Sequence, residues 1–184
     1  MANLFYAGKM LSQDADSQVV NALYQEDGVN AAVKDGSFVV LGDLAEDLLY
    51  KASGDYQYDV YKATAPAAVT DRVVVLDYAG IPGGDINENY YRIGNKLFNL
   101  EAPKDEPVRA RRLFLGDKFW LGEDNFLAKP TVKQYAELKA NACKLDPKAA
   151  HTAGQFGVKI LKEQDLNAGM ELKGKMYLVE VIDL

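Results

Sequence analysis

The stretch Lys175-Met176-Tyr177-Leu178-Val179-Glu180-Val181-Ile182 carries the strongest secondary-structure signal in the chain. It is rich in β-branched and aromatic residues, which pack well on a pleated sheet, and no glycine or proline interrupts it. We therefore predict a β-strand that fixes this end of the chain in a sheet. The run Arg72-Val73-Val74-Val75-Leu76 is apolar at successive positions, which predicts a central strand buried on both faces.

Shorter strand signals occur throughout the rest of the sequence, separated by Gly, Pro and Asp. A helix is also expected at Pro130–Cys143, where apolar residues recur with helical spacing. Ser17–Tyr24 shows similar spacing and either forms a short helix or is part of an extended arm. This pattern predicts a mainly β fold, a sandwich or a barrel with one or two short helices, with α+β as the alternative class. Further strands are expected at 37–41, 56–62, 90–93, 96–100, 109–115, 119–121 and 156–160.

The domain organisation follows from where the strand signals begin. Residues 1–35 lack a sustained strand pattern, and we leave open whether they form a short helix or an extended arm. Residues 36–184 form a β-rich body, either one unit or two small subdomains divided at the charged turn near 101–107. Gly36–Asp43 and Gly116–Glu123 share a spacing of glycines, apolar residues and an acid. This similarity marks either a duplicated β-unit or a chance recurrence of a common strand-turn pattern.

The composition of the chain excludes some kinds of site and argues against some classes of partner. Among 184 residues, 48% are hydrophobic and 26% charged, as in ordinary globular proteins. A single cysteine excludes an internal disulfide, and a single histidine excludes every site that needs two. The net charge of −6 opposes binding to phosphate backbones and anionic lipid. We therefore expect no nucleic-acid partner and no membrane partner.

The charge is unevenly distributed along the chain. Residues 1–92 carry 6 basic and 14 acidic side chains, a balance of −8, whereas residues 93–184 carry 15 and 13, a balance of +2. The two halves either present faces of opposite sign to a charged partner or are simply two solvated surfaces. The first residues lack the basic and apolar regions of a secretory signal, so we expect synthesis in the cytoplasm.

The usual catalytic templates are missing. His151 has no nucleophile motif near it and is interpreted as a surface-loop residue. Cys143, on the expected helix, is interpreted as a small packed hydrophobic residue. No glycine-rich phosphate loop is present. The sequence thus predicts no catalytic, cofactor-binding or metal-binding residue, and no cofactor.

One polar segment partly matches a calcium loop. Asp85, Asn87 and Asn89 stand at the first, third and fifth positions, where alternating oxygens converge on the ion. The match ends at Tyr90, where the loop needs glycine, and at Lys96, where it needs a bidentate glutamate. A polar loop is the expected structure, and a calcium site of another type is the alternative.

Two acidic clusters and a group of tyrosines are the remaining candidates for functional residues. Paired carboxylates can hydrolyse glycosidic bonds, but acids beside turns usually face water. Tyrosines on a sheet either stack on sugars and anchor an interface, or simply pack as strand residues. The acids are Asp43, Glu46, Asp47, Glu123 and Asp124; the tyrosines are Tyr50, Tyr56, Tyr58 and Tyr61.

Four stretches together resemble the head decoration (cement) proteins of tailed bacteriophages: 33–41 (VKDGSFVVL), 61–66 (YKATAP), 116–121 (GDKFWL) and 175–181 (KMYLVEV). The resemblance covers most of the chain loosely and transfers no functional residue. It implies a non-enzymatic virion protein, made in the host cytoplasm, that binds the exterior of the major capsid protein lattice. It also implies an N-terminal arm in that contact and a homo-oligomeric state.

Two other functions compete with decoration. The first is a carbohydrate-binding β-sandwich that uses exposed tyrosines and Trp120. The second is a small hydrolase that uses an acidic pair. Aromatic residues aligned on one face of a sheet would favour the first, and a pocket that holds two carboxylates would favour the second.

Overall fold

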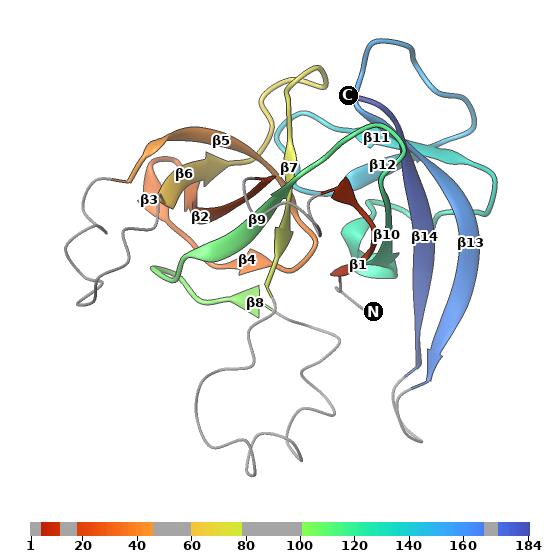
Figure 1. The fold of residues 1–184 in the computed structure, drawn as a ribbon, viewed down its shortest axis with the longest axis horizontal. Helices are drawn as coiled ribbons and strands as arrows, with labels where there is room; N and C mark the ends of the chain where they lie inside the picture. Colours follow the sequence, from red (N-terminus) through yellow and green to blue (C-terminus); the bar gives the residue numbers. More distant parts are fainter. Residues whose placement is uncertain (1–4, 12–17, 46–59, 79–100, 168–172) are drawn as a thin grey trace.

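A computed structural model describes residues 5–11, 18–45, 60–78, 101–167 and 173–184 (Figure 1). These residues are organised in three sheets and contain no complete α-helix, so the expected β-rich fold is confirmed. Two large sheets form the body, and a small third one pairs β4 (Val33–Lys34) with β8 (Glu101–Ala102).

The first large sheet closes on itself. Its strands run in the order β3-β2-β6-β5-β7-β9, and an additional pairing of β2 with β9 joins the two sides into a five-stranded barrel. Strands β2 and β6 are parallel, and the other barrel pairs are antiparallel. The strands are β2 (Val19–Glu26), β3 (Val29–Asn30), β5 (Phe38–Leu44), β6 (Val60–Thr64), β7 (Val74–Asp77) and β9 (Val108–Arg112).

The barrel has its own hydrophobic core. Ala22, Ala63 and Ala110 are almost fully buried, and they leave room for larger residues such as Val39 and Leu76. Small side chains are needed at some positions because a barrel with few strands has a narrow interior.

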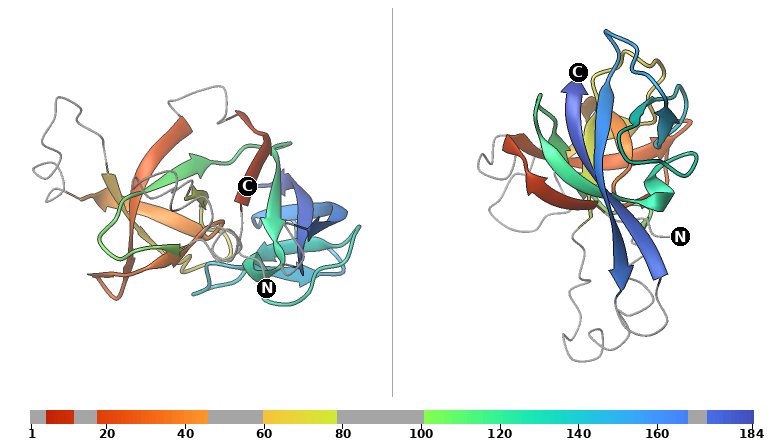
Figure 2. Two further views of the ribbon diagram at one scale, coloured as in Figure 1. Left: turned by 90° about the horizontal axis from the view of Figure 1, so that it is seen from below. Right: turned by 90° about the vertical axis from the view of Figure 1, so that its right-hand side faces the viewer.

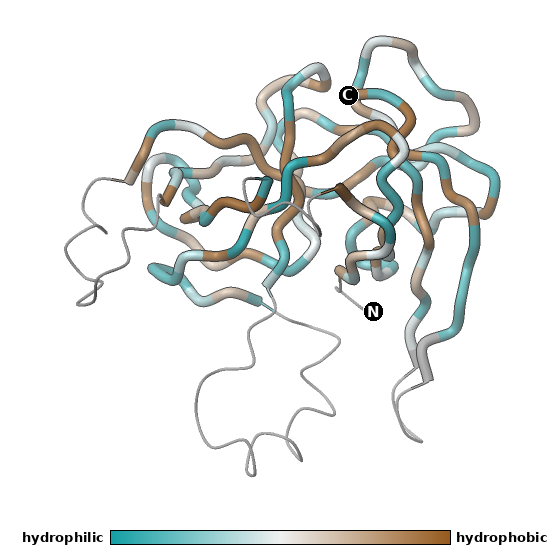
Figure 3. The backbone as a smooth tube through the Cα atoms, viewed as in Figure 1, coloured by the Kyte–Doolittle hydropathy of each residue, from teal (hydrophilic) through white to brown (hydrophobic). Residues whose placement is uncertain are grey.

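The second large sheet is antiparallel, with the order β1-β10-β14-β13-β11-β12. Its long hairpin β13–β14 projects beyond the rest of the body (Figures 1 and 2), and the distal half of β13 is hydrophilic (Figure 3). A 3-10 turn, η3 (Glu123–Asn125), follows β10. The strands are β1 (Phe5–Lys9), β10 (Lys118–Gly122), β11 (Tyr135–Leu138), β12 (Leu145–Lys148), β13 (Gly157–Asn167) and β14 (Lys173–Asp183).

Strands β5 and β7 contribute to two cores at once. Val39 and Val74 face the barrel interior, whereas Phe38 and Val75 face the second sheet. The prediction of a central strand around 72–76, apolar on both faces, is therefore confirmed.

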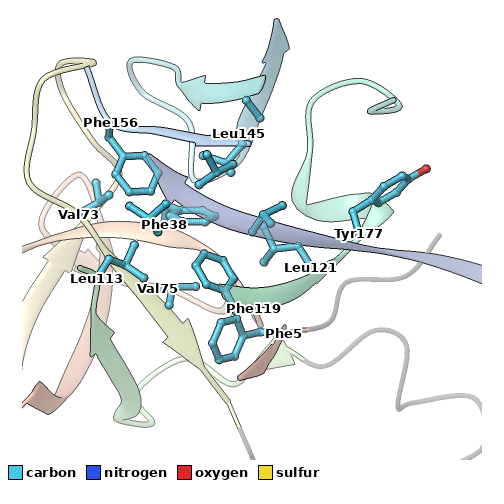
Figure 4. Packing of buried hydrophobic residues seen from close by; sticks show 14 of the residues in the cluster. Phe5, Phe38, Val73, Val75, Leu113, Phe119, Leu121, Leu145, Phe156 and Tyr177 are labelled. Atoms are coloured by element: carbon cyan, nitrogen blue, oxygen red, sulfur yellow. The ribbon is translucent and has the colours of Figure 1, made fainter. Parts of the chain in front are cut away.

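A row of four phenylalanines connects the barrel with the second sheet (Figure 4). The ring centroids of Phe156 and Phe38 are 5.6 Å apart, those of Phe38 and Phe119 are 6.4 Å apart, and those of Phe119 and Phe5 are 5.5 Å apart. Tilted aromatic pairs at such distances add to the stability gained from burial alone. The row makes the two sheets one packed unit.

Asp35 links the same parts through polar contacts. Its buried carboxylate accepts hydrogen bonds from the backbone N–H of Phe5 at 2.7 Å and of Tyr78 at 2.8 Å. Its backbone carbonyl accepts a hydrogen bond from the side-chain amide of Asn125 at 2.7 Å. Burial raises the pKa of Asp35 to about 7, although the two N–H donors oppose the shift. One side chain thus holds β1 beside the end of β7.

The expected helix at Pro130–Cys143 is wrong, and the helical alternative for Ser17–Tyr24 is not what its described residues form. Most of Ser17–Tyr24 lies in β2, whose residues Ala22 to Tyr24 are buried on both faces of the strand between β6 and β9. Apolar spacing alone did not separate helix from strand here, and the partner strands decide the outcome. Pro130–Cys143 contains the strand β11, and positive φ angles of 74° at Lys133 and 59° at Asn141 prevent a continuous helix.

The described part of residues 1–35 belongs to the sheets of the body. Strand β1 pairs with β10 and β2 pairs with β6 and β9, so these strands form neither a helix nor a detached arm. Near 101–107 the chain passes from β8 in the small sheet to β9, which belongs to the barrel as β7 does. A division into subdomains there stays a prediction.

The similar segments at 36–43 and 116–123 occupy related places in the two sheets. They form β5 and β10, which pack against each other through Phe38 and Phe119. Each begins at a glycine with positive φ, 72° at Gly36 and 85° at Gly116. The expected hairpin at 90–100 lies outside the described residues.

Candidate functional site

Three large side chains form a row on the outer face of the second sheet, and we call it the aromatic row: Tyr6, Trp120 and Leu178. Tyr6 in β1 is directly opposite Trp120 in β10, which is directly opposite Leu178 in β14. Residues that are directly opposite in an antiparallel sheet share a face and lie within contact distance. The row therefore spans three neighbouring strands.

Strand alternation explains why these side chains face outward. Their neighbours Phe5, Phe119 and Val179 point into the core and are buried, so the intervening residues must point away from it. Tyr6 is 66% exposed, and Trp120 and Leu178 are half-buried. A row of large apolar side chains that is at least partly open to solvent on a sheet face is typical of a binding surface.

Basic side chains flank the aromatic row. Lys118 is opposite Lys9 on one side and Glu180 on the other, and Glu180 is opposite Lys159. The Lys118 ammonium lies 3.3 Å from the Glu180 carboxylate, a partly exposed ion pair that contributes little to stability. Three lysines against one glutamate leave this border of the row positively charged.

Gly8 allows β1 to approach β10 closely. The β1–β10 register shifts between Ala7 and Lys9, which marks a bulge, and a Cβ on Gly8 would lie 2.4 Å from the carbonyl oxygen of Lys118. Only glycine fits such an approach. The bulge and the charged Lys9 also make β1 a poor template for pairing with another strand, although it is an edge strand.

His151 forms a second polar centre. Its ring nitrogens lie 3.0 Å from a Glu137 oxygen and 3.2 Å from an Asp183 oxygen. The same carboxylates accept backbone N–H donors, Glu137 from Thr152 and Asp183 from Gly154. The donors from Gly154 and His151 hold the pKa of Asp183 below its ordinary value.

This centre fastens the loop at 149–156 to β11 and to the end of β14. Because both ring nitrogens of His151 already face carboxylates, the ring is not placed to activate a hydroxyl nucleophile. The residue does lie in a loop, as predicted, but it is half-buried and bonded rather than freely exposed. The sequence did not show its partners, because Asp183 is 32 residues away from it.

Cys143 is half-buried beside the barrel core, in keeping with its interpretation as a packed residue. Its sulfur lies 3.5 Å from the hydroxyl of Tyr24, and its backbone carbonyl accepts a hydrogen bond from the N–H of Phe38. Burial raises the pKa of the Cys143 thiol, which disfavours the thiolate that a nucleophile needs.

The described acids that were singled out in the sequence lie in different parts of the fold. Asp43 is exposed near the end of β5 in the barrel, whereas Glu123 and Asp124 form the first turn of η3 beside the second sheet. Tyr61 is half-buried in β6. Outside the described residues lie Glu46, Asp47, Tyr50, Tyr56, Tyr58, Asp85, Asn87 and Asn89.

The described residues contain no group of three or more His, Cys, Asp or Glu side chains placed to hold a metal ion. They also contain no helix with the length and apolar character needed to cross a membrane.

No family model, curated protein or solved structure matches this chain. The aromatic row is the candidate functional site because strand register aligns its three side chains on one face and Tyr6 is exposed there.

Proposed function

We propose that this chain is a non-enzymatic structural protein that decorates an assembled protein lattice, in the manner of the head decoration proteins of tailed bacteriophages. The observation that carries the proposal is the aromatic row of Tyr6, Trp120 and Leu178 on the outer face of the second sheet. The major capsid protein lattice is the proposed partner, and the exterior of the virion is the proposed location.

The composition of this face suits a protein interface. Tyr and Trp are enriched among residues whose truncation weakens protein complexes most, since each buries a large rigid surface and keeps a polar group at its edge. Lys9, Lys118 and Lys159 lie along one border of the row, as part of a charged rim would. On a lattice, a modest contact of this size gains strength when neighbouring copies or sites act together.

The proposal is tested by sedimentation of purified protein with undecorated capsids and with free capsid subunits. We expect binding to assembled shells and about tenfold weaker binding for Tyr6→Ala, because truncation of an interface anchor costs more than about 1 kcal/mol. Val29→Ala is the matched control, since Val29 is 65% exposed on the barrel and outside the aromatic row. High salt should weaken attachment only in part, because screening acts on the lysines and not on the apolar contacts.

Two results would overturn decoration as the function. One is equal binding to subunits and shells, and the other is failure to bind either of them. Unchanged binding by Tyr6→Ala would leave decoration standing and remove the aromatic row as its contact.

Carbohydrate binding is the second candidate, and the adjacency of Tyr6 and Trp120 favours it. Neighbouring aromatic faces on a sheet can stack on sugar rings. Titration with soluble oligosaccharides, followed by Trp120 fluorescence, separates the two functions. Carbohydrate binding would replace decoration as the proposal if oligosaccharides quench Trp120 fluorescence saturably, if Tyr6→Ala loses this quenching, and if the unaltered protein does not bind capsids.

A further inference from the structure

A hollow of about 340 Å³ is lined by residues of the barrel strands β5, β7 and β9 and by residues that precede β7 and follow β9. None of its lining residues belongs to the aromatic row. The lining is of mixed polarity, and its apolar members include Val40, Leu41 and Leu113. The volume is at the lower end of the range for small-molecule sites.

Two arginines line this hollow, Arg72 before β7 and Arg112 at the end of β9. Within the described part of the chain, neither guanidinium forms an ion pair. The other two arginines of β9 behave differently: Arg109 lies 2.9 Å and Arg111 lies 2.6 Å from the same oxygen of Asp77.

The acid at the rim does not neutralise both cations. Asp71 lines the hollow, but one of its oxygens accepts a hydrogen bond from the backbone N–H of Ala68 at 2.8 Å and closes a local turn. Two guanidinium groups against one carboxylate leave the rim with a charge of about +1. This contrasts with the net charge of −6 for the whole chain.

We propose that this hollow binds an organic carboxylate with a short apolar chain. Arginine presents paired N–H donors that match the two oxygens of a carboxylate, which gives strong and oriented hydrogen bonds. The apolar side chains of the lining contact the chain of the ligand and remove part of it from water. The proposal is independent of lattice decoration, because the hollow and the aromatic row share no residue.

The test is a calorimetric titration of the full chain with hexanoate, acetate, hexanol and inorganic phosphate. We expect saturable binding of hexanoate, at least about tenfold weaker binding of acetate, which lacks the chain, and no binding of hexanol. Arg112→Gln and Arg72→Gln should each weaken hexanoate binding about tenfold, since each removes a charged donor. Lys104→Gln, in an exposed turn, is the charge-matched control and should bind as the unaltered chain does.

A further variant tests the sign of the electrostatic effect. Asp71→Asn keeps an oxygen that can accept from Ala68 but removes the negative charge, so it should bind hexanoate several-fold more tightly. Arg72 is exposed, so its substitution should leave the fold intact even if that of Arg112 does not. The proposal is wrong if hexanoate does not saturate, if hexanol or phosphate binds equally well, or if Arg72→Gln binds normally.

Discussion

At the scale of single residues, Asp35 shows how one buried carboxylate couples ionisation to the fold. Its oxygens bind the backbone of β1 and the residue after β7, while burial opposes its negative charge. Asp117 plays a comparable part, since its carboxylate accepts the N–H of Leu11 and of Phe114, and burial raises its pKa as well. The two aspartates fix the turns that precede β5 and β10.

Asp35 should make stability depend on pH. An aspartate in the unfolded chain ionises near pH 4, whereas Asp35 keeps its proton until about pH 7. Between these values the folded state binds more protons, so this residue lowers the free energy of unfolding by about 1.4 kcal/mol per pH unit as pH rises. Denaturant titrations from pH 4 to pH 7.5 measure the slope.

Asp35→Asn isolates this effect. The variant cannot ionise at this position, so we expect a shallower pH dependence, with the remaining slope due in part to Asp117. It should also be less stable by about 1–3 kcal/mol at low pH, because an amide N–H₂ would face a backbone N–H donor. Asp43→Asn, at an exposed position, is the control. An unchanged slope in Asp35→Asn would contradict the prediction.

At the scale of elements, the loop at 149–156 depends on His151. The ring joins Glu137 in β11 to Asp183 at the end of β14, and it packs so closely on Gly157 that a Cβ there would lie 2.4 Å from a ring carbon. Three elements therefore meet at one side chain.

Replacing His151 should loosen this loop. His151→Ala removes both ring contacts and leaves the buried Glu137 with fewer donors, so we expect a loss of about 1–2 kcal/mol. Hydrogen exchange should be faster at Thr152 and Gly154, whose N–H groups donate to the two carboxylates. Lys104→Ala is the control, because Lys104 lies in an exposed turn outside this loop. Unchanged protection in His151→Ala would show that the loop is held by other contacts.

Local patterns predicted some elements well and others badly, for physical reasons. Strands β7 and β14 were predictable because their residues are apolar and β-branched over a continuous run. Strand β2 could not be predicted, and a helix and an extended arm both stayed open, because its burial depends on β6 and β9, which lie far away in the sequence. The aromatic row was only partly visible: Trp120 was named as a candidate, but its neighbours Tyr6 and Leu178 follow from strand register.

At the scale of the whole molecule, the two sheets are stabilised by a shared core that includes the first described strand. Phe5 is 6% exposed and packs against Phe119, while Phe38 and Val75 enter the same cluster from the barrel. The N-terminal strand is therefore a structural part of the body.

Phe5→Ala should destabilise the entire fold by about 3–5 kcal/mol, because it opens a cavity in this core. Tyr6→Ala, at the adjacent exposed position, should change the free energy of unfolding by less than about 0.5 kcal/mol. Chemical denaturation of the two variants measures both values. Equal stability of the two variants would mean that β1 contributes to the body only weakly.

The pairing of β1 with β10 also determines the order in which the chain can assemble during synthesis. Phe5 pairs with Leu121, so β1 has no partner strand until β10 has been synthesised. Strand β2 finds β3 and β6 earlier, but its pairing with β9, which closes the barrel, also waits for distant residues. Contacts between such distant residues require large loops to close, which slows folding. Until β10 is synthesised, the apolar face of β1 is exposed in the nascent chain, and only dilution or chaperones protect it from aggregation.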